Sequence, residues 1–378
     1  MKVLRIMAVW SFLITLASCT KEDFKDFLDS ANPGKGAAGQ VYTLNNQVSG
    51  NYVLLYKRNS DGTLTPDGSL ATGGMGTGAG LGSQGALNLS ANHKWLFAVN
   101  AGSNDISVME VKDRKLKLID KVPSGGTMPI SLTQYGSWLY VLHAGGTGNI
   151  TGFTLSANGH LTPIPNSTRP LSSPAAGPAQ VQFSQDGNAL IVTEKATNTI
   201  SSYPVNGSGV AGMLNTHPAA GQTPFGFSLG HQNQFYVSEA WGGAPNKSTL
   251  SSYAIDAAGN ITTLDGPKPT NQTSACWVVT TNNGKLVYTV NAASGSLSGF
   301  QVDNTGKLTL LHPSGIAGVT GEGSSPTDAA LSEDSKFLYV LQSGTQAIKA
   351  FTVNSSGSLS PVDEEAGLPV GTVGLVAR

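Results

Sequence analysis

Short apolar runs alternate with polar turn sequences from about residue 40 to the end of the chain. The clearest stretch, residues 326–362, reads PTDAALS, EDS, KFLYVLQS, a short loop, AIKAFTV, NSSG and SLSPV. Apolar runs of this length, separated by turns that contain Asp, Asn and Gly, are typical of antiparallel strands joined by tight turns. We therefore predict four strands in this stretch and name them a, b, c and d in chain order.

The same unit recurs along the chain with a spacing of roughly 50 residues, which is typical of β-propeller blades. Strand b gives the most similar copies, which read VYTLN, LFAVN, LYVLH, LIVTE, FYVSE, VYTVN and LYVLQ. Seven copies of a four-stranded unit predict an all-β fold, a seven-bladed β-propeller of four-stranded antiparallel blades, over residues 39–378.

The first copy of the unit has no strand a, because its first apolar run already matches strand b. The last residues of the chain, 371–377, read GTVGLVA and have strand-a character without a following strand b. We predict that this C-terminal strand closes the first blade, which leaves no long open sheet edge. Removal of the last eight residues is therefore expected to destabilise the fold severely.

The connections of such a meander alternate between two faces of the ring. The a–b and c–d turns share one face and are short and uniform, as in SQDG, TNNG, DNTG and SANG. The b–c and d–a loops share the other, which we call the variable face; its loops are 71–85, 165–177, 215–223, 240–249, 265–274 and 312–325. Loop variation on one face of a regular scaffold is typical of a binding site.

Polar residues end all seven b strands at the variable face: Asn45, Asn100, His143, Glu194, Glu239, Asn291 and Gln342. The starts of the a strands add Gln180, Gly226, Trp277 and Asp328. A histidine beside carboxylates can act as a general base. Oxygens of Glu, Asn and Asp that converge on a propeller channel could instead hold Ca²⁺. The same groups could also simply pair with backbone and channel water, and the sequence leaves the three interpretations open.

Other polar and aromatic residues of the variable face allow two interpretations each. Arg169 could bind an anionic substrate and Trp241 could stack on a sugar or another ring, but either could anchor its own loop. Lys195 follows Glu194 and is expected to point away from it, because neighbours on a strand face opposite sides. The glycine-rich residues 73–82 precede no helix, so we do not interpret them as a phosphate-binding loop.

The first nineteen residues have the features of an export signal. Lys2 and Arg5 precede an apolar segment, residues 7–16, that is too short to span a bilayer. The following Leu-Ala-Ser-Cys19 resembles a bacterial lipobox, and the acidic stretch behind it resembles the surface-export signal of Bacteroidetes-type lipoproteins. We expect a signal peptide over 1–19, lipidation of Cys19, a polar tether over 20–38, and a protein anchored to the outer membrane, facing the periplasm or the cell surface.

The composition of the chain limits the classes of partner that the protein is expected to bind. The chain of 378 residues has a formal net charge of −1 and only 12% charged residues, so it shows no basic patch of the kind that nucleic acid requires. We expect a monomer that contacts the membrane only through its lipid and binds a small lactone or a carbohydrate. The two cysteines form no disulfide framework, and Cys276 lies in an apolar strand as a buried hydrophobe or, alternatively, a catalytic thiol.

Several motifs resemble those of the seven-bladed lactonase propellers, a family with 6-phosphogluconolactonase-type and carboxymuconate-cyclase-type enzymes. They are FAVNAGSNDI at 97–106, the blade starts Gly177-Pro178 and Thr223-Pro224, and hairpins such as DGTL at 61–64. Family enzymes commonly carry Arg-His after the Gly-Pro that opens a central blade, where this chain has Ala179 and Gln180. The family's strand-b glutamate corresponds to Glu194.

The resemblance implies a lactonase-like hydrolase at the cell envelope. Arginines are scarce after Cys19 and an exported protein would not meet a cytosolic phosphosugar, so we expect an unphosphorylated sugar or aromatic lactone. His143 or Glu194 would activate water with Glu239 nearby, and the candidate substrate-binding residues are Gln180, Arg169, Asn100, Asn291, Trp241, Trp277 and Asp328. The competing interpretation is a non-catalytic propeller that binds a glycan or a protein partner through the variable face.

Overall fold

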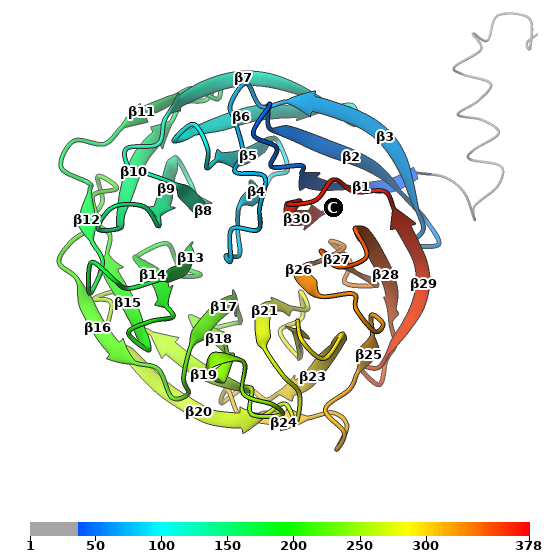
Figure 1. The fold of residues 1–378 in the computed structure, drawn as a ribbon. Coiled ribbons are helices and arrows are strands. Elements are labelled where there is room, and N and C mark those ends of the chain that lie inside the picture. The colour runs from blue at the N-terminus through cyan, green and yellow to red at the C-terminus, as the bar shows by residue number, and fades with distance from the viewer. Residues whose placement is uncertain (1–36) are drawn as a thin grey trace, which may run out of the picture.

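The computed structural model describes residues 37–378, which form a ring of seven antiparallel sheets (Figure 1). Each sheet is one blade, in which strand a lies nearest to the ring centre and strand d on the outside. The predicted seven-bladed propeller of four-stranded blades is thus confirmed. The expected signal peptide, the lipidated Cys19 and residues 20–36 of the expected tether lie outside the described residues.

Strands a to d follow each other in chain order in blades 2 to 4. Blade 2 consists of β4 (Leu87–Leu89), β5 (Trp95–Asn100), β6 (Asp105–Lys112) and β7 (Lys115–Pro123). Blade 3 consists of β8 (Pro129–Tyr135), β9 (Trp138–His143), β10 (Asn149–Leu155) and β11 (Leu161–Pro163), with β12 (Arg169–Pro170) also paired to β10. Blade 4 consists of β13 (Pro178–Phe183), β14 (Ala189–Glu194), β15 (Thr199–Pro204) and β16 (Asn215–Pro218).

Blades 5 to 7 repeat this order. Blade 5 consists of β17 (Pro224–Leu229), β18 (Gln234–Glu239), β19 (Thr249–Ile255) and β20 (Ile261–Pro269). Blade 6 consists of β21 (Ala275–Thr280), β22 (Leu286–Asn291), β23 (Ser296–Val302) and β24 (Leu308–Leu310), with β25 (Gly318–Val319) also paired to β23. Blade 7 consists of β26 (Pro326–Leu331), β27 (Phe337–Gln342), β28 (Ala347–Val353) and β29 (Leu359–Ala366).

Blade 1 joins the two ends of the described chain. It consists of β30 (Val373–Ala377), β1 (Ala37–Leu44), β2 (Tyr52–Asn59) and β3 (Leu64–Ala71). β30 pairs antiparallel with β1, with Val41 opposite Ala377 and Thr43 opposite Leu375. The predicted closure of the first blade by the C-terminal strand is therefore confirmed.

The core lies between neighbouring blades, and the b strands supply its largest side chains. Strand b has a partner strand on either side and a neighbouring blade against each face, so strands such as β5 and β14 are buried at every position. Tyr140 on β9 and Tyr339 on β27 are fully buried, and their hydroxyls donate to the carbonyls of Gly209 and Gly62 in the next blade's c–d turn. Both glycines have φ near +80 to +90°, which a turn residue without Cβ adopts readily.

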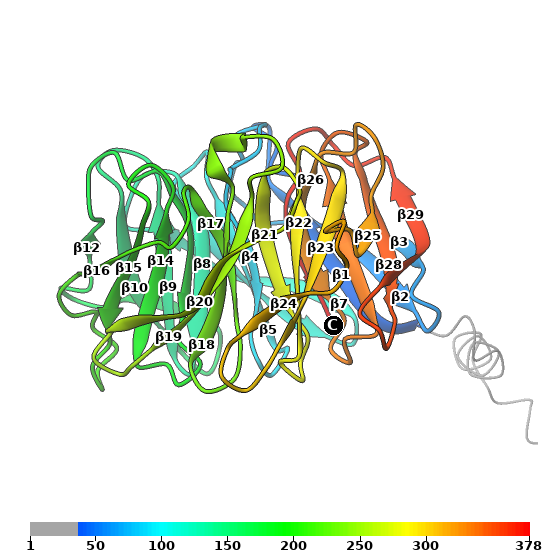
Figure 2. The same ribbon diagram turned by 90° about the horizontal axis from the view of Figure 1, so that it is seen from below.

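Figure 2 shows the strands running from one face of the ring to the other, with the short 3₁₀ helix η2 (Trp241–Gly243) on the variable face. No helix within residues 37–378 combines the length and the apolar character needed to cross a membrane.

Candidate functional site on the variable face

The polar ends of the b strands lie together near the variable face, but one strand away from the channel, because strand a separates them from it. The side chains of His143, Glu194, Glu239, Asn100 and Asn291 are all 0% exposed. Loops of the variable face, both d–a and b–c, cover Glu194 and Glu239. The alternation of the connections between two faces predicted correctly that the ends of the b strands lie at the variable face. The burial of their polar side chains depends on how the loops fold over them, which the sequence pattern does not encode.

Glu194, at the end of β14, accepts four hydrogen bonds. Its Oε1 accepts from the backbone N–H of Ser172 at 3.1 Å and from Ser201 Oγ at 2.7 Å. Its Oε2 accepts from Ser172 Oγ and from Thr197 Oγ1, the latter at 3.1 Å. Ser172 and Thr197 are half-buried residues of two variable-face loops. Two hydroxyls therefore connect this buried carboxylate to the surface of the variable face.

Glu239, the equivalent residue of blade 5, is enclosed more completely. Its carboxylate accepts from the N–H of Gly221 at 3.2 Å, from Thr249 Oγ1 and from Tyr253 O–H at 3.2 Å, and all three residues are buried. Burial raises the pKa of Glu239 above its usual range. Trp241 donates its indole N–H to Thr249 Oγ1 at 2.9 Å, so this ring anchors the b–c loop over Glu239.

His143, at the end of β9, lies under the backbone of the preceding loop. A Cβ on Gly126 would come within 2.5 Å of the imidazole ring, which shows how closely that loop covers it. Nδ1 lies 3.3 Å from the carbonyl oxygen of Asn149, to which it must donate, and Nε2 is buried without a partner among the described residues. Burial lowers the pKa of His143 to about 4, so the imidazole is neutral at neutral pH.

The amides of the ring join strand b to strand c. Asn100 donates to Asp105 Oδ1 at 2.6 Å and to Ser107 Oγ at 2.8 Å, and its Oδ1 accepts from Thr72 Oγ1 at 2.6 Å. Asn291 donates to Ser296 Oγ and Ser298 Oγ at 3.1 and 2.9 Å. These amides thus pair with hydroxyl and carboxyl side chains of nearby strands and loops. The use of Asn100 and Asn291 in substrate binding stays a prediction.

Side chains of the a strands join neighbouring blades around the channel. Gln180 accepts from the N–H of Phe227 at 2.7 Å and donates to its carbonyl at 3.0 Å, so it clamps blade 4 to blade 5. Asp328 occupies the equivalent position in blade 7, where its carboxyl group accepts from the N–H of Ala329 at 2.8 Å and faces the N–H of Leu375 on the closing strand. Only 3% of the surface of Asp328 is exposed. This burial raises the pKa of Asp328 to about 8, so the side chain carries a proton at neutral pH.

The glycine-rich loop between β3 and β4 crosses the mouth of the channel (Figure 1). It supplies the side chain that joins blade 5 to blade 6, because blade 5 itself has no side chain at the position equivalent to Gln180. That blade has Gly226 at the clamp position, and a Cβ there would lie 2.1 Å from Gln84 Oε1. Gln84 instead accepts from the N–H of Val278 at 3.0 Å and donates to its carbonyl at 2.8 Å. The glycines of this segment thus belong to a loop that packs into the channel mouth.

The ammonium group of Lys195 lies at the same channel mouth, beside the glycine-rich loop. This group does not contact Glu194; it donates to the carbonyl of Gly82 at 2.6 Å and lies 4.8 Å from the centre of the Phe225 ring. Phe225 packs against Trp277 with 4.9 Å between ring centres, and the Trp277 indole donates to Ser83 O at 2.9 Å. Sequence reasoning did not assign Lys195 a function, because its surroundings depend on the loop that crosses the channel.

Arg169 lies at the outer edge of blade 3, on β12. Its guanidinium donates to the carbonyls of Gly212, Asn166 and Thr168, each at 2.8 Å. These bonds hold the loop against blade 4. Within residues 37–378 no cluster of three or more His, Cys, Asp or Glu side chains has the arrangement of a metal site.

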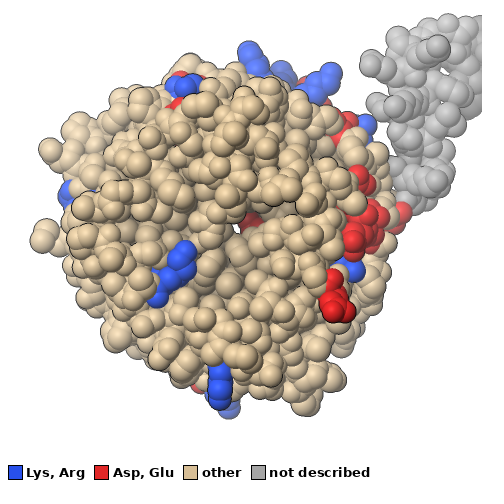
Figure 3. Space-filling view, viewed as in Figure 1, with Lys and Arg blue, Asp and Glu red and all other residues tan. Residues whose placement is uncertain are grey.

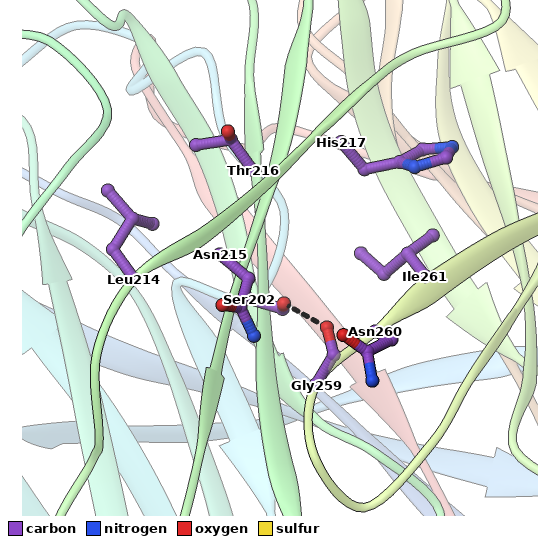
Figure 4. Close-up of a pocket in the computed structure, with 8 residues that line it drawn as sticks. All are labelled: Ser202, Leu214, Asn215, Thr216, His217, Gly259, Asn260 and Ile261. Carbon is purple, nitrogen blue, oxygen red and sulfur yellow. Dashed lines mark hydrogen bonds between the residues drawn. The ribbon is translucent and has the colours of Figure 1, made fainter.

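A separate groove of about 410 Å³ opens on the ring between blades 4 and 5 (Figure 4). Its lining is neutral: Ser202, Leu214, Asn215, Thr216, His217, Gly259, Asn260 and Ile261. Ser202 Oγ donates to the carbonyl of Gly259 at 2.5 Å and Asn215 donates to that of Ala258 at 3.1 Å, so the two blades are bridged at its base. Burial lowers the pKa of His217, which keeps this imidazole uncharged at neutral pH.

Comparison with known proteins agrees with the geometry. A family model described as a lactonase, seven-bladed β-propeller, matches residues 38–176 and 230–326. A curated relative, an uncharacterized protein of Staphylococcus saprophyticus, is 24% identical over 160 residues, which cover 40% of this chain and 45% of that protein. The match to this relative therefore spans less than half of its length.

Solved structures share the fold at low identity. A periplasmic gluconolactonase of Pseudomonas aeruginosa superposes with a TM-score of 0.67 at 16% identity, over 88% of this chain and 98% of that one. A protein from Lactobacillus plantarum gives 0.70 at 20% identity, over 90% and 99%. A candidate 6-phosphogluconolactonase of Bacteroides fragilis gives 0.68 at 18% identity, over 90% and 98%.

Proposed function

Because the chain belongs to the family of seven-bladed β-propeller lactonases, we propose that it hydrolyses the ring ester of a small, unphosphorylated sugar or aromatic acid on its variable face. We place this reaction at the cell envelope, with the protein held by a lipid on Cys19. The similarity of the fold to a periplasmic gluconolactonase supports this location and substrate class.

The observation that carries the proposal is the connection of Glu194 to the variable face through Ser172 and Thr197. Of the two carboxylates in the ring, only Glu194 has half-buried hydroxyl partners, since those of Glu239 are buried. A carboxylate within hydrogen-bond reach of a water can act as its general base. Glu194 is therefore the better placed base of the two, and His143 lies under its loop.

In the proposed reaction, a water bound at the hydroxyls of Ser172 and Thr197 attacks the ester carbonyl and gives its proton to Ser172 Oγ, while the Ser172 hydroxyl passes its own proton to Glu194. The tetrahedral intermediate collapses with cleavage of the bond between the acyl carbon and the ring oxygen. Glu194 then returns the proton through the Ser172 hydroxyl to the ring oxygen, which leaves as a hydroxyl. The products are a hydroxyl and a carboxylic acid on one opened chain, and the acid ionises at neutral pH.

The charge of the variable face supports an unphosphorylated substrate. Figure 3 shows that charged side chains are sparse over its centre, while acidic ones gather at one edge over β29, which carries Asp363, Glu364 and Glu365. A phosphate dianion is normally held by several basic groups. Arg169 donates to three carbonyls at the outer edge of blade 3, whereas Lys195 lies at the channel mouth.

A panel of lactones tests the proposal: D-glucono-1,5-lactone, its 6-phosphate and an aromatic lactone, each with purified protein, with and without EDTA. We expect turnover of an unphosphorylated lactone, a loss of roughly a hundredfold or more in Glu194→Gln, and a smaller loss in the matched control Glu239→Gln. Absence of turnover on every lactone would refute the proposal. Loss of turnover on EDTA alone would assign the chemistry to a metal ion, and loss in His143→Ala with Glu194→Gln unaffected would move the base to His143.

A second function, carbohydrate binding without catalysis, is favoured by one observation. The groove between blades 4 and 5 is lined by neutral amide and hydroxyl groups together with an apolar Ile261, a combination suited to an uncharged sugar (Figure 4). Glycan binding that Asn215→Ala and Asn260→Ala abolish, in a protein without lactonase activity, would establish this function in place of hydrolysis.

A further inference from the structure

The ammonium group of Lys195 lies at the channel mouth on a half-buried side chain. It contacts a backbone carbonyl and the face of a phenylalanine ring, and no acidic side chain pairs with it in the part of the chain that the structure describes. We propose that Lys195 binds the carboxylate of the ligand at the channel mouth, namely the acid group that ring opening creates. The choice of this ligand rests on the proposed function.

Desolvation makes the ammonium group receptive to an anion. Lys195 is half-buried against Phe225, and burial lowers its pKa. A charge removed from water is costly unless an opposite charge or several hydrogen bonds compensate it. The single carbonyl of Gly82 and the ring of Phe225 compensate only part of this cost, so a carboxylate gains more at Lys195 than at an exposed lysine.

The surroundings bring no negative charge that would satisfy Lys195 from within the protein. The neighbouring thiol of Cys276 is buried, which raises its pKa to about 12 and keeps it neutral. Trp277 directs its indole N–H to Ser83. No hydrogen-bond partner lies at the N–H groups of Gly80 and Gly82 among residues 37–378, and both glycines are exposed. Amide donors thus lie in the same loop whose carbonyl contacts the ammonium group.

Lactone hydrolysis creates an acid group that the positive charge of Lys195 can bind. A lactone is neutral at its ester group, whereas the product carries a carboxylate there. Lys195 directly follows Glu194, the proposed base, at the end of β14. Its side chain points to the opposite side of the strand from Glu194, so Lys195 acts on the opened acid and not on the attacking water. A fixed cation there favours the anionic product over its neutral precursor. In this position Lys195 is a binding residue for the acid end of the ligand.

Direct binding to the purified full chain tests the assignment without any need for turnover. Calorimetry would compare D-gluconate and benzoate with their neutral amides, for the wild type, Lys195→Met and Lys195→Arg. Met keeps the apolar stem over Phe225, and Arg keeps the charge. We expect a carboxylate to bind the wild type, to bind Lys195→Met roughly tenfold to hundredfold more weakly, and to bind Lys195→Arg with little change, while amide binding changes in neither variant.

Equal carboxylate affinity in the wild type and in a folded Lys195→Met, checked by its melting temperature, would overturn the inference, as would absence of carboxylate binding to the wild type. The outcome is separable from the proposed function. Lysine-dependent carboxylate binding without lactonase activity would leave the site standing and remove the hydrolase. Lactonase activity with Lys195-independent binding would do the reverse.

Discussion

The closing strand β30 allows a quantitative prediction, because so few residues complete the ring. Removal of residues 371–378 deletes four cross-strand pairs with β1 and the buried Leu375. Truncation of a buried leucine alone costs about 2–5 kcal/mol. Loss of β30 would also remove the Leu375 N–H that faces the buried carboxyl group of Asp328, at a cost of about 1–3 kcal/mol. The sum approaches the whole stability of a typical domain, about 5–15 kcal/mol.

Chemical and thermal denaturation followed by circular dichroism would measure the effect. The truncated protein is expected to be unfolded or to melt far below the wild type, and Leu375→Ala is expected to lose about 2–5 kcal/mol. The control is Val370→Ala, directly before the removed segment and 64% exposed, which should stay within about 0.5 kcal/mol of the wild type. A truncated protein that melts within a few degrees of the wild type would show that β30 does not hold the ring closed.

Two further predictions concern the channel. Asp328 keeps its proton up to about pH 8 in the folded protein, whereas an unfolded aspartate loses it near pH 4, so the free energy of unfolding falls as the pH rises between these values. Asp328→Asn should flatten this fall in urea titrations from pH 4 to 9, and an unchanged slope would contradict the assignment. Gly226→Ala should cost about 1–3 kcal/mol, because its Cβ would meet Gln84, while Gly207→Ala, which has open space, should cost less than about 1 kcal/mol. Equal losses at the two glycines would argue against the Gln84 clamp.

The sequence was sufficient for the fold because each blade repeats the same strand and turn chemistry. The seven b-strand copies, the short turns of one face and the unpartnered C-terminal strand all have local signals, and the structure confirms the architecture that they predict. The ends of the b strands also lie on the variable face, as the antiparallel order of the strands in each blade requires.

The site could be predicted only in part, because it depends on loops. Glu194 was identified from its position in strand b, but its burial and its link to Ser172 follow from the path of a d–a loop. The surroundings of Lys195 depend on the glycine-rich loop, which reaches across the ring from blade 1. Such loop contacts, between residues 22 and 113 positions apart, leave no periodic signal in the sequence.

The central claim, that Glu194 serves as the base of a lactonase, is tested most directly by the rate of ring opening of D-glucono-1,5-lactone at fixed pH, corrected for spontaneous hydrolysis. We predict a protein-dependent rate that falls by roughly a hundredfold or more in Glu194→Gln and is largely kept in Glu239→Gln. A wild-type rate no faster than spontaneous hydrolysis, or a Glu194→Gln variant as fast as the wild type, would contradict the account.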